Sequence, residues 1–353
     1  MFFQIIFVIN IIYKNTLADG KKSLVLTGKE HYLSTDGCHE ILRTLRREVL
    51  EPYGAFAVGE TVFVDVKGAR DLCEAERGEL DLVFEFEHME CDQVFVKWFK
   101  TWLSPKRLMK TIDKWQRALT FNAVYFENHD QPRFISRFSD SALYREKCSK
   151  MMAGLLMSLR GVPFLFEGQE IGMTNGDFKD LSEVEDIESH NIYAMAKSLH
   201  IPESIRWKMI KRGSRDNART PMQWTGGENA GFTSGKPWLK INANHKEVNV
   251  EREKSLPDGV LSFYKKMIEM RKTNSALSEG EYIPLYIGKR VFAFARTFGE
   301  ETLISVMNMT AKKARLPRKL RVSSQTLISN YQNEEAPLEP FEFRLLRLSE
   351  NDG

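Results

Sequence analysis

The sequence contains little cysteine and no surplus of one charge. Its four cysteines lie far apart among 353 residues and form no Cys-x-x-Cys pair, which argues against a disulfide framework and against a zinc site. Such sparse use of cysteine is typical of a reducing compartment. Lys and Arg number 51 against 48 Asp and Glu, so the net charge of +3 gives no basic field for nucleic acid. The remaining composition, 42% hydrophobic and 28% charged, is that of a globular protein.

The sequence also lacks a hydrophobic run long enough to cross a membrane. The apolar stretch at 2–12, FFQIIFVINII, is well short of the roughly 20 residues that a spanning helix needs. No Lys or Arg precedes it, as one would in a signal peptide. A continuous apolar run rich in β-branched residues is typical of a buried parallel strand, the interpretation we favour over a signal peptide. We therefore expect a soluble, cytoplasmic protein without a membrane partner.

Short apolar stretches alternate with amphipathic helical segments through the first 275 residues. After the run at 2–12, the sequence predicts strands at 55–58, 81–86, 123–126 and 163–166. The predicted helices are 37–50, 104–119, 144–159 and 256–271. The apolar face of the first is expected to carry Ile41, Leu42, Leu45 and Val49, and that of 144–159 to carry Met151, Leu155, Leu156 and Leu159. Strands that alternate with helices in this way indicate a parallel sheet with crossover helices, and so an α/β fold resembling a β/α barrel.

Two later regions depart from this alternation. Residues 171–257 are rich in Asn, Gly and charge and have no clear period, but Trp224, Phe232 and Trp238 are too apolar for a disordered linker. We expect a long excursion at the barrel rim. From 279 to 353 the sequence changes to strands and turns, which predicts a separate small antiparallel β domain, a sandwich, after a barrel portion at 1–275.

Acidic residues follow three of the predicted strands, namely Glu60, Asp130 and Glu170. In a β/α barrel the active site occupies the rim at the carboxyl ends of the strands. Glycoside hydrolysis needs two carboxylates across the scissile bond, and an apolar wall before Glu60 would raise its pKa so that it acts as a general acid. On the residue pattern alone, a surface-loop Glu60 and an Asx turn at 129–130 remain the commoner alternatives.

The sequence contains no recognisable cofactor motif. The seven histidines show no metal-ligand spacing, and no Gly-x-Gly-x-x-Gly or Gly-Lys-Ser loop is present for a nucleotide. We expect no cofactor, and we leave calcium open.

Four sequence motifs occur in the order in which one protein family carries them, and this combination is highly specific for that family. They are AVGET at 57–61, ENHDQPRFISRF at 127–138, GVPFLFEGQEIGMTN at 161–175 and SRDNARTPMQW at 214–224. With AGFTSGKPWLKINANHKEVNVE at 230–251, they resemble the α-amylase superfamily, glycoside hydrolase family 13. Within it the chain is similar to the oligo-1,6-glucosidase, dextran glucosidase and trehalose-6-phosphate hydrolase group.

The resemblance implies roles for five residues. Glu60 matches the general acid/base, and Asp130 the transition-state stabiliser that holds sugar hydroxyls. His129 matches the adjacent subsite histidine, and Arg219 the arginine that fixes the terminal glucose. Glu170 is a further candidate for the rim near the leaving group. The implied partner is a short oligosaccharide.

The chain departs from the family pattern where the nucleophile belongs. The family places its nucleophilic aspartate two residues after an arginine in a strand, and the register of 8–14 assigns these positions to Phe7 and Ile5. The run at 2–12 then corresponds to the fourth barrel strand, and we expect a partial (β/α)8 barrel of strands four to eight.

Phenylalanine cannot attack an anomeric carbon, so we expect little or no hydrolysis by this chain alone. The alternatives are a non-catalytic relative that binds sugar or a partner, as in the heavy subunits of some amino-acid transporters, and a fragment of a frameshifted gene. Trehalose 6-phosphate is the alternative substrate.

Overall fold

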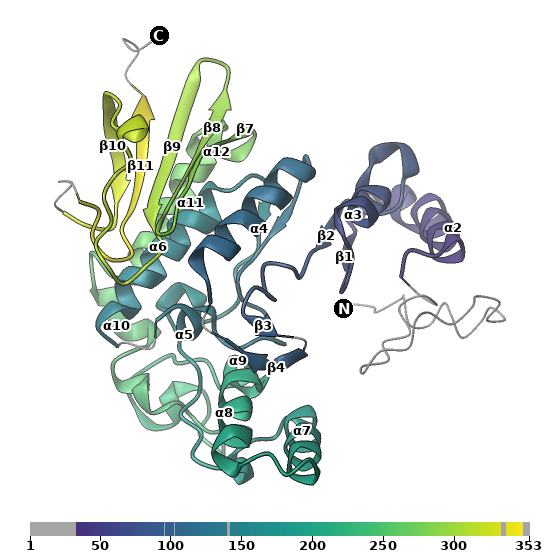
Figure 1. Cartoon of the computed structure of the whole chain (residues 1–353), viewed down its shortest axis with the longest axis vertical. Coiled ribbons are helices and arrows are strands. Elements are labelled where there is room, and N and C mark those ends of the chain that lie inside the picture. Colours follow the sequence, from purple (N-terminus) through teal and green to yellow (C-terminus); the bar gives the residue numbers. More distant parts are fainter. Residues whose placement is uncertain (1–32, 95, 102, 140–141, 333–336, 349–353) are drawn as a thin grey trace. The chain divides into compact units, whose positions relative to one another are not determined.

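The computed structural model describes residues 33–94, 96–101, 103–139, 142–332 and 337–348 (Figure 1). The chain divides into two compact units, which we describe separately. Unit 1 comprises 1–88 with 114–123, and unit 2 comprises 89–113 with 124–353. The predicted strand at 2–12, and Phe7 with it, lies outside the described residues.

Unit 1 contains a parallel pair of strands, β1 (Val58–Glu60) and β2 (Leu82–Phe84). Its helices are α2 (Asp36–Leu45) and α3 (Val66–Cys73). Side chains of Thr35 and Asp65 cap these helices by accepting hydrogen bonds from backbone N–H groups of the first turn. The apolar sides of α2, α3 and β2 pack with Trp115 and Leu119 in one cluster, whose other members include Cys38, Leu42, Ala69, Leu72 and Val83.

Two predictions for unit 1 need correction. The helix expected at 37–50 ends at Leu45 and continues as a π-helical turn, η2 (Arg46–Leu50), then η3 (Glu51–Tyr53), and Val49 is 47% exposed rather than on the buried face. The strand expected at 55–58 lies instead at 58–60. Its partner decides this register, because Asp81 already accepts a hydrogen bond from the Ala57 N–H at 2.6 Å and the ladder begins at the next residue on each strand.

Unit 2 begins with an antiparallel hairpin and continues with the helices that carry its core. The hairpin consists of β3 (Gln93–Val94) and β4 (Val96–Lys100), and β5 (Ala123–Val124) pairs with β6 (Val162–Pro163). The helices are α4 (Pro105–Ala118), whose residues from Lys114 on belong to unit 1, α5 (Phe134–Phe138) and α6 (Arg145–Ser158). The expected starts of α4 and α6 are confirmed to within one residue, and Ser104 caps α4 by accepting a bond from Arg107 N at 3.4 Å.

The region at 171–257 contains more helix than its sequence suggests. It includes α7 (Ile187–Ser198), α8 (Glu203–Gly213), α9 (Asp216–Arg219) and α10 (Val250–Ser255). The three aromatic residues that argued against disorder, Trp224, Phe232 and Trp238, are 48%, 42% and 61% exposed. Order here comes instead from small buried clusters, one of them Ile171, Met173, Met222, Val248 and Val250.

The carboxyl-terminal region forms one five-stranded antiparallel sheet in the order β10-β11-β9-β8-β7. The strands are β7 (Glu281–Ile287), β8 (Val291–Phe298), β9 (Glu301–Asn308), β10 (Ser324–Ser329) and β11 (Phe343–Leu348). They follow α11 (Val260–Thr273) and α12 (Ser275–Ser278), and confirm the expected antiparallel β region. The sandwich and the boundary near 279 stay predictions, because the described residues form one sheet that belongs to the same compact unit as 124–275.

The remaining ordered pieces are single helical turns. They are η4 (Ala75–Arg77), η5 (Ala142–Tyr144), η6 (Gln169–Ile171), η7 (Leu181–Glu183), η8 (Glu228–Gly231), η9 (Ala243–Lys246) and η10 (Arg318–Leu320).

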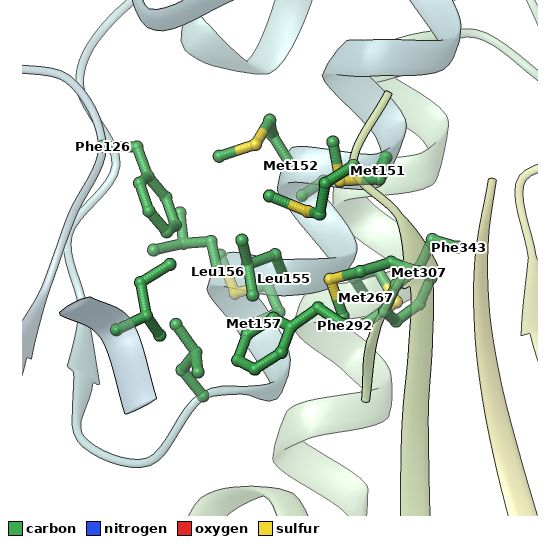
Figure 2. Close-up of a cluster of buried hydrophobic side chains, with 14 of the residues drawn as sticks. Phe126, Met151, Met152, Leu155, Leu156, Met157, Met267, Phe292, Met307 and Phe343 are labelled. Atoms are coloured by element: carbon green, nitrogen blue, oxygen red, sulfur yellow. The ribbon is translucent and has the colours of Figure 1, made fainter. Parts of the chain in front are cut away.

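The main core lies between α6, α11 and one face of the sheet, and it is rich in methionine (Figure 2). The buried positions predicted for α6, namely Met151, Leu155, Leu156 and Leu159, are all at most 2% exposed. A Cβ on Gly154 would lie 2.5 Å from the Phe343 ring, so only glycine allows α6 to approach β11 this closely.

Two buried arginines close the carboxyl end of α6. Arg271 of α11 donates to the carbonyls of Met157 and Leu159 at 2.7 and 2.8 Å, and Arg296 of β8 donates to Ser158 O at 2.9 Å. Cations are favourable at this end of a helix because its last carbonyls lack partners. Burial nevertheless lowers the pKa of Arg271 to about 10 and that of Arg296 to about 9.

The described helices include none that is both long and apolar enough to cross a membrane. All four cysteines are free thiols.

Candidate active site

Asp130 lies in the loop that follows β5, and arginine side chains surround it. Its backbone N–H donates to Asn128 Oδ1 at 3.0 Å, so the turn predicted here is an Asx turn made by Asn128. Arg219, at the end of α9, donates from Nη2 to Asp130 Oδ1 at 2.8 Å and from Nε to His129 O at 2.8 Å. The structure therefore brings together three predicted site residues.

A second arginine, Arg215, contacts the same carboxylate and two more. Its Nη1 is 3.4 Å from Asp130 Oδ1, its Nη2 is 3.0 Å from Glu188 Oε2, and its Nε is 3.3 Å from Asp186 Oδ1. Burial opposes the charged form, but the three carboxylates outweigh it and raise the pKa of Arg215 above its ordinary value. Arg215 thus connects the amino end of α7 to the Asp130 loop.

The segment carrying both arginines is fixed by backbone contacts on its buried side. Asp216 accepts hydrogen bonds from the backbone N–H groups of Glu185 and Asp186 at 2.6 and 3.0 Å. Asn217 donates to Lys211 O at 3.1 Å. Because Asp216 and Asn217 point inward on this single helical turn, the arginines at 215 and 219 are held together on the other side.

One oxygen of Asp130 remains available for a ligand. Both arginines contact Oδ1, whereas Oδ2 lies 3.6 Å from His129 Nε2. The Asp130 side chain is 31% exposed and that of His129 is 60% exposed. Oδ2 can therefore accept a hydrogen bond from a hydroxyl, while the arginines bound to Oδ1 fix the orientation of the carboxylate.

A buried ion pair lies beneath the loop. Arg133 Nη1 donates to Glu127 Oε2 at 2.9 Å, and both side chains are 1% exposed. Arg133 also donates to Glu167 O at 2.7 Å, beyond β6, and to Ala218 O at 3.3 Å in α9. This guanidinium therefore ties together the loop after β5, the loop after β6 and the helix that carries Arg219.

Glu170 occupies η6, on the Arg133 side of the site. Burial raises the pKa of its carboxyl, although its own backbone N–H, that of Gly168 and the charge of Arg133 act in the opposite direction. The structure places it close enough to Arg133 and Glu167 for their charges to act on it, rather than among the residues that contact Asp130. Its predicted role near a leaving group stays a prediction.

Glu60 is the last residue of β1, in unit 1, where it pairs with Phe84 and is half-buried. A Cβ on the preceding Gly59 would lie 2.6 Å from Leu80 Cδ1, so glycine permits the close packing of this strand end. The acid/base role of Glu60 stays a prediction. Within the residues that the structure describes, no group of three His, Cys, Asp or Glu side chains could hold a metal ion.

The sequence analysis missed four contributors, namely Arg215, Asp186, Glu188 and Arg133. Arg215 could have been found, because it precedes Arg219 by four positions in the same motif, a spacing that puts two side chains on one helical face. Asp186 and Glu188 lie in the region without clear periodicity, where no sequence signal separates them from other acidic residues.

Known proteins resemble this chain over most of its length. The model of the alpha-amylase catalytic domain matches residues 6–280. The oligo-1,6-glucosidase of Bacillus cereus is 38% identical over 339 residues, which are 92% of this chain and 60% of that protein. The trehalose-6-phosphate hydrolase of Bacillus subtilis is 32% identical over 337 residues, 91% of this chain and 60% of that protein. The chain thus spans less than two thirds of the curated relatives it matches.

Solved structures give the same result. The crystal structure of Bacillus licheniformis trehalose-6-phosphate hydrolase has a TM-score of 0.86 at 33% identity, covering 93% of this chain and 62% of that one. The isomaltulose synthase from Klebsiella sp. LX3 has a TM-score of 0.85 at 32% identity, covering 90% and 60%. The chain combines α/β elements of part of the family barrel with a carboxyl-terminal antiparallel sheet, and it belongs to the alpha-amylase family of glycoside hydrolases.

Proposed function

We propose that this chain carries the sugar-binding residues of an α-glucosidase site of the oligo-1,6-glucosidase type. The proposed ligand is a terminal α-linked glucose. The observation that carries the proposal is the Asp130 carboxylate, whose Oδ1 contacts Arg219 at 2.8 Å and Arg215 at 3.4 Å while Oδ2 has His129 at 3.6 Å. Two guanidinium groups orient the Asp130 carboxylate through Oδ1, so Oδ2 can accept a hydrogen bond from a sugar hydroxyl.

In the retaining mechanism that we infer for the intact site, Glu60 protonates the leaving oxygen and a carboxylate attacks the anomeric carbon. Asp130 and Arg219 hold the ring while charge develops on it. The family register assigns Phe7 to the attacking position, and a benzyl side chain has no electron pair to donate. We therefore propose that hydrolysis by the 353-residue chain is low or absent, and that its remaining activity is sugar binding.

The substrate of the intact site is proposed from the relatives. Those described as oligo-1,6-glucosidases are up to 39% identical, against 32% for the trehalose-6-phosphate hydrolase of Bacillus subtilis. We therefore place isomaltose before trehalose 6-phosphate.

Binding and turnover are tested separately. The chain is incubated with p-nitrophenyl α-glucoside, isomaltose and trehalose 6-phosphate, and we expect turnover at least about a thousandfold below that of an intact oligo-1,6-glucosidase. Binding of glucose and isomaltose is measured by saturation-transfer NMR, and Asp130→Asn is expected to weaken it about tenfold or more.

Asp258→Asn is the matched control, because the Asp258 side chain is 79% exposed and its carboxylate lies 3.5 Å from the ammonium of the exposed Lys266. It should bind sugar as the unchanged chain does. Turnover comparable to an intact relative would overturn the proposed loss of hydrolysis, and equal sugar binding by Asp130→Asn would overturn the role of Asp130. If the chain bound trehalose 6-phosphate but not isomaltose, trehalose 6-phosphate would be the ligand in place of isomaltose.

A further inference from the structure

Lys100, the last residue of β4, points into the interior of unit 2. Alternate residues of a strand lie on the same face, so Lys100 shares its face with Trp98. Trp98 is 4% exposed and packs against α8, where a Cβ on Gly213 would lie 2.7 Å from its ring. The side chain of Lys100 is therefore directed beneath α8, on the side of β4 away from solvent.

The amino group of Lys100 is buried and has no partner. The residue as a whole is half-buried, whereas its Nζ atom is inaccessible to solvent and makes no hydrogen bond with any described residue. Three other buried cations have partners: Arg271 and Arg296 each bind backbone carbonyls, and Lys150 donates to Glu146 Oε1 at 2.5 Å. A buried cation without such partners carries a large desolvation penalty.

A second unsatisfied donor lies close to Lys100. Arg137 binds Asp92 with two hydrogen bonds of 2.8 Å and donates to Met89 O at 2.7 Å, but its Nη1 atom is buried without a partner among the described residues. Lys100 pairs with Gln93 in the β3–β4 hairpin, so the adjacent Asp92, and Arg137 bound to it, lie near Lys100. Their charges act on Lys100, and two buried donors of one sign are therefore neighbours.

The nearby carboxylates are already engaged. Both oxygens of Asp92 are bound by Arg137, and Glu188 is bound by Lys97 at 2.5 Å and by Arg215 at 3.0 Å. Arg212 of α8 adds a further positive charge that acts on Lys100. The charge of Asp92 favours the protonated amine, but both of its oxygens bind Arg137, and no carboxylate among the described residues binds Lys100 Nζ.

We propose that Lys100 Nζ and Arg137 Nη1 bind a small monovalent inorganic anion of the chloride class. One negative charge balances the one ammonium that lacks a partner, and a halide accepts hydrogen bonds from both donors without requiring a particular orientation. A divalent oxyanion would bring one negative charge more than the single unpartnered ammonium balances.

The competing state is a neutral amine. Burial, with the charge of Arg137, lowers the pKa of Lys100 to about 7, so without an anion the amine loses its proton near neutrality. An anion bound beside it would favour the protonated form. The two states therefore predict different responses to salt composition at fixed ionic strength.

Thermal unfolding of the full chain is followed at pH 7 in sodium chloride and in sodium gluconate of equal ionic strength. We expect chloride to raise Tm by about 2–4 °C in a saturable manner, because a ligand that binds only the folded state stabilises it by mass action. Lys100→Met should lose this response. Lys110→Met, at an exposed lysine of α4, is the matched control and should keep it.

Bromide provides a direct test that needs no variant. Crystals of the unchanged chain are soaked in sodium bromide, and an anomalous peak is expected within hydrogen-bond distance of Lys100 Nζ and Arg137 Nη1. A water or an empty position there, a peak only elsewhere, or a chloride response that persists in Lys100→Met would overturn the proposal. A peak without any rise of Tm in solution would mean binding at crystal concentration only, and would overturn it as well.

Discussion

Two carboxylates of the loop after β5, Glu127 and Asp130, are both held by arginine, but in different surroundings. The Glu127–Arg133 pair is 1% exposed on each side, whereas Asp130 and Arg219 are 31% and 29% exposed. Arg133 also donates hydrogen bonds to the carbonyls of Glu167 and Ala218. The buried pair therefore organises the backbone, and the open one is left able to bind a ligand.

The comparison indicates how the same chemical pair serves two purposes. Removing one partner of a buried ion pair leaves an uncompensated charge in the interior, which is strongly destabilising. An exposed pair has water as its alternative partner, so its loss is inexpensive. The loop thus carries a buried ion pair at Glu127 and a partly exposed one at Asp130, three positions apart.

The largest effect is expected from Arg133→Met. This change leaves Glu127 buried without a counter-charge and frees the carbonyls of Glu167 and Ala218, so we expect a loss of about 3–5 kcal/mol in the free energy of unfolding. Urea denaturation measures it. Adding Glu127→Gln should restore part of the loss, and Arg252→Met, at an exposed arginine, should cost almost nothing. A loss below about 1 kcal/mol for Arg133→Met would show that the pair is not the base of the loop.

A smaller effect is expected from Arg215→Leu. It removes contacts to three carboxylates, of which Asp186 is 2% exposed, so a buried acceptor loses its counter-charge. We expect about 1–2 kcal/mol of destabilisation, moderated because Ser189 and backbone N–H groups still bind Asp186. Calorimetry measures the change. Arg206→Leu in α8 is the control for arginine packing, because the Arg206 side chain is half-buried over the ring of Tyr193 in α7.

Asp130→Asn should barely alter stability. The amide keeps its shape and can still accept from Arg219, so the expected change in the free energy of unfolding is below about 1 kcal/mol, against a marked loss of sugar binding. Chemical denaturation and ligand titration of one preparation give both quantities. If stability fell as far as it does in Arg133→Met, the contrast between the two carboxylates would be wrong.

The smallest expected effect concerns pH. Burial raises the pKa of Glu170 above its unfolded value, so the folded chain binds more protons between the two pKa values. Stability should therefore fall as the pH rises through that window and stay constant above it. Glu170→Gln should remove this part of the slope when Tm is recorded from pH 4 to 7. An unchanged slope would mean that Glu170 is solvated.

Sequence patterns predicted many of the helices and strands, because the periodicity of apolar residues along an element reflects which of its faces is buried. The apolar face of α6 is buried as expected, and the region after 279 forms antiparallel strands as expected. The register of β1 and the exposure of Val49 could not be predicted, because a strand partner and a change of helix type decided them. In the site, motifs indicated Asp130, His129 and Arg219, and the structure assembles these three.

The sequence by itself determined the family, the alternation of strands and helices, and the residue types available for chemistry, since each depends on the local order of side chains. Only the tertiary structure decided which charges meet. Glu127 and Asp130 are three positions apart and chemically alike, yet one is enclosed and the other open. Glu127 is paired with Arg133, which is itself held by carbonyls of the loop after β6 and of α9. Burial is a property of neighbours distant in the chain, so no local pattern records it.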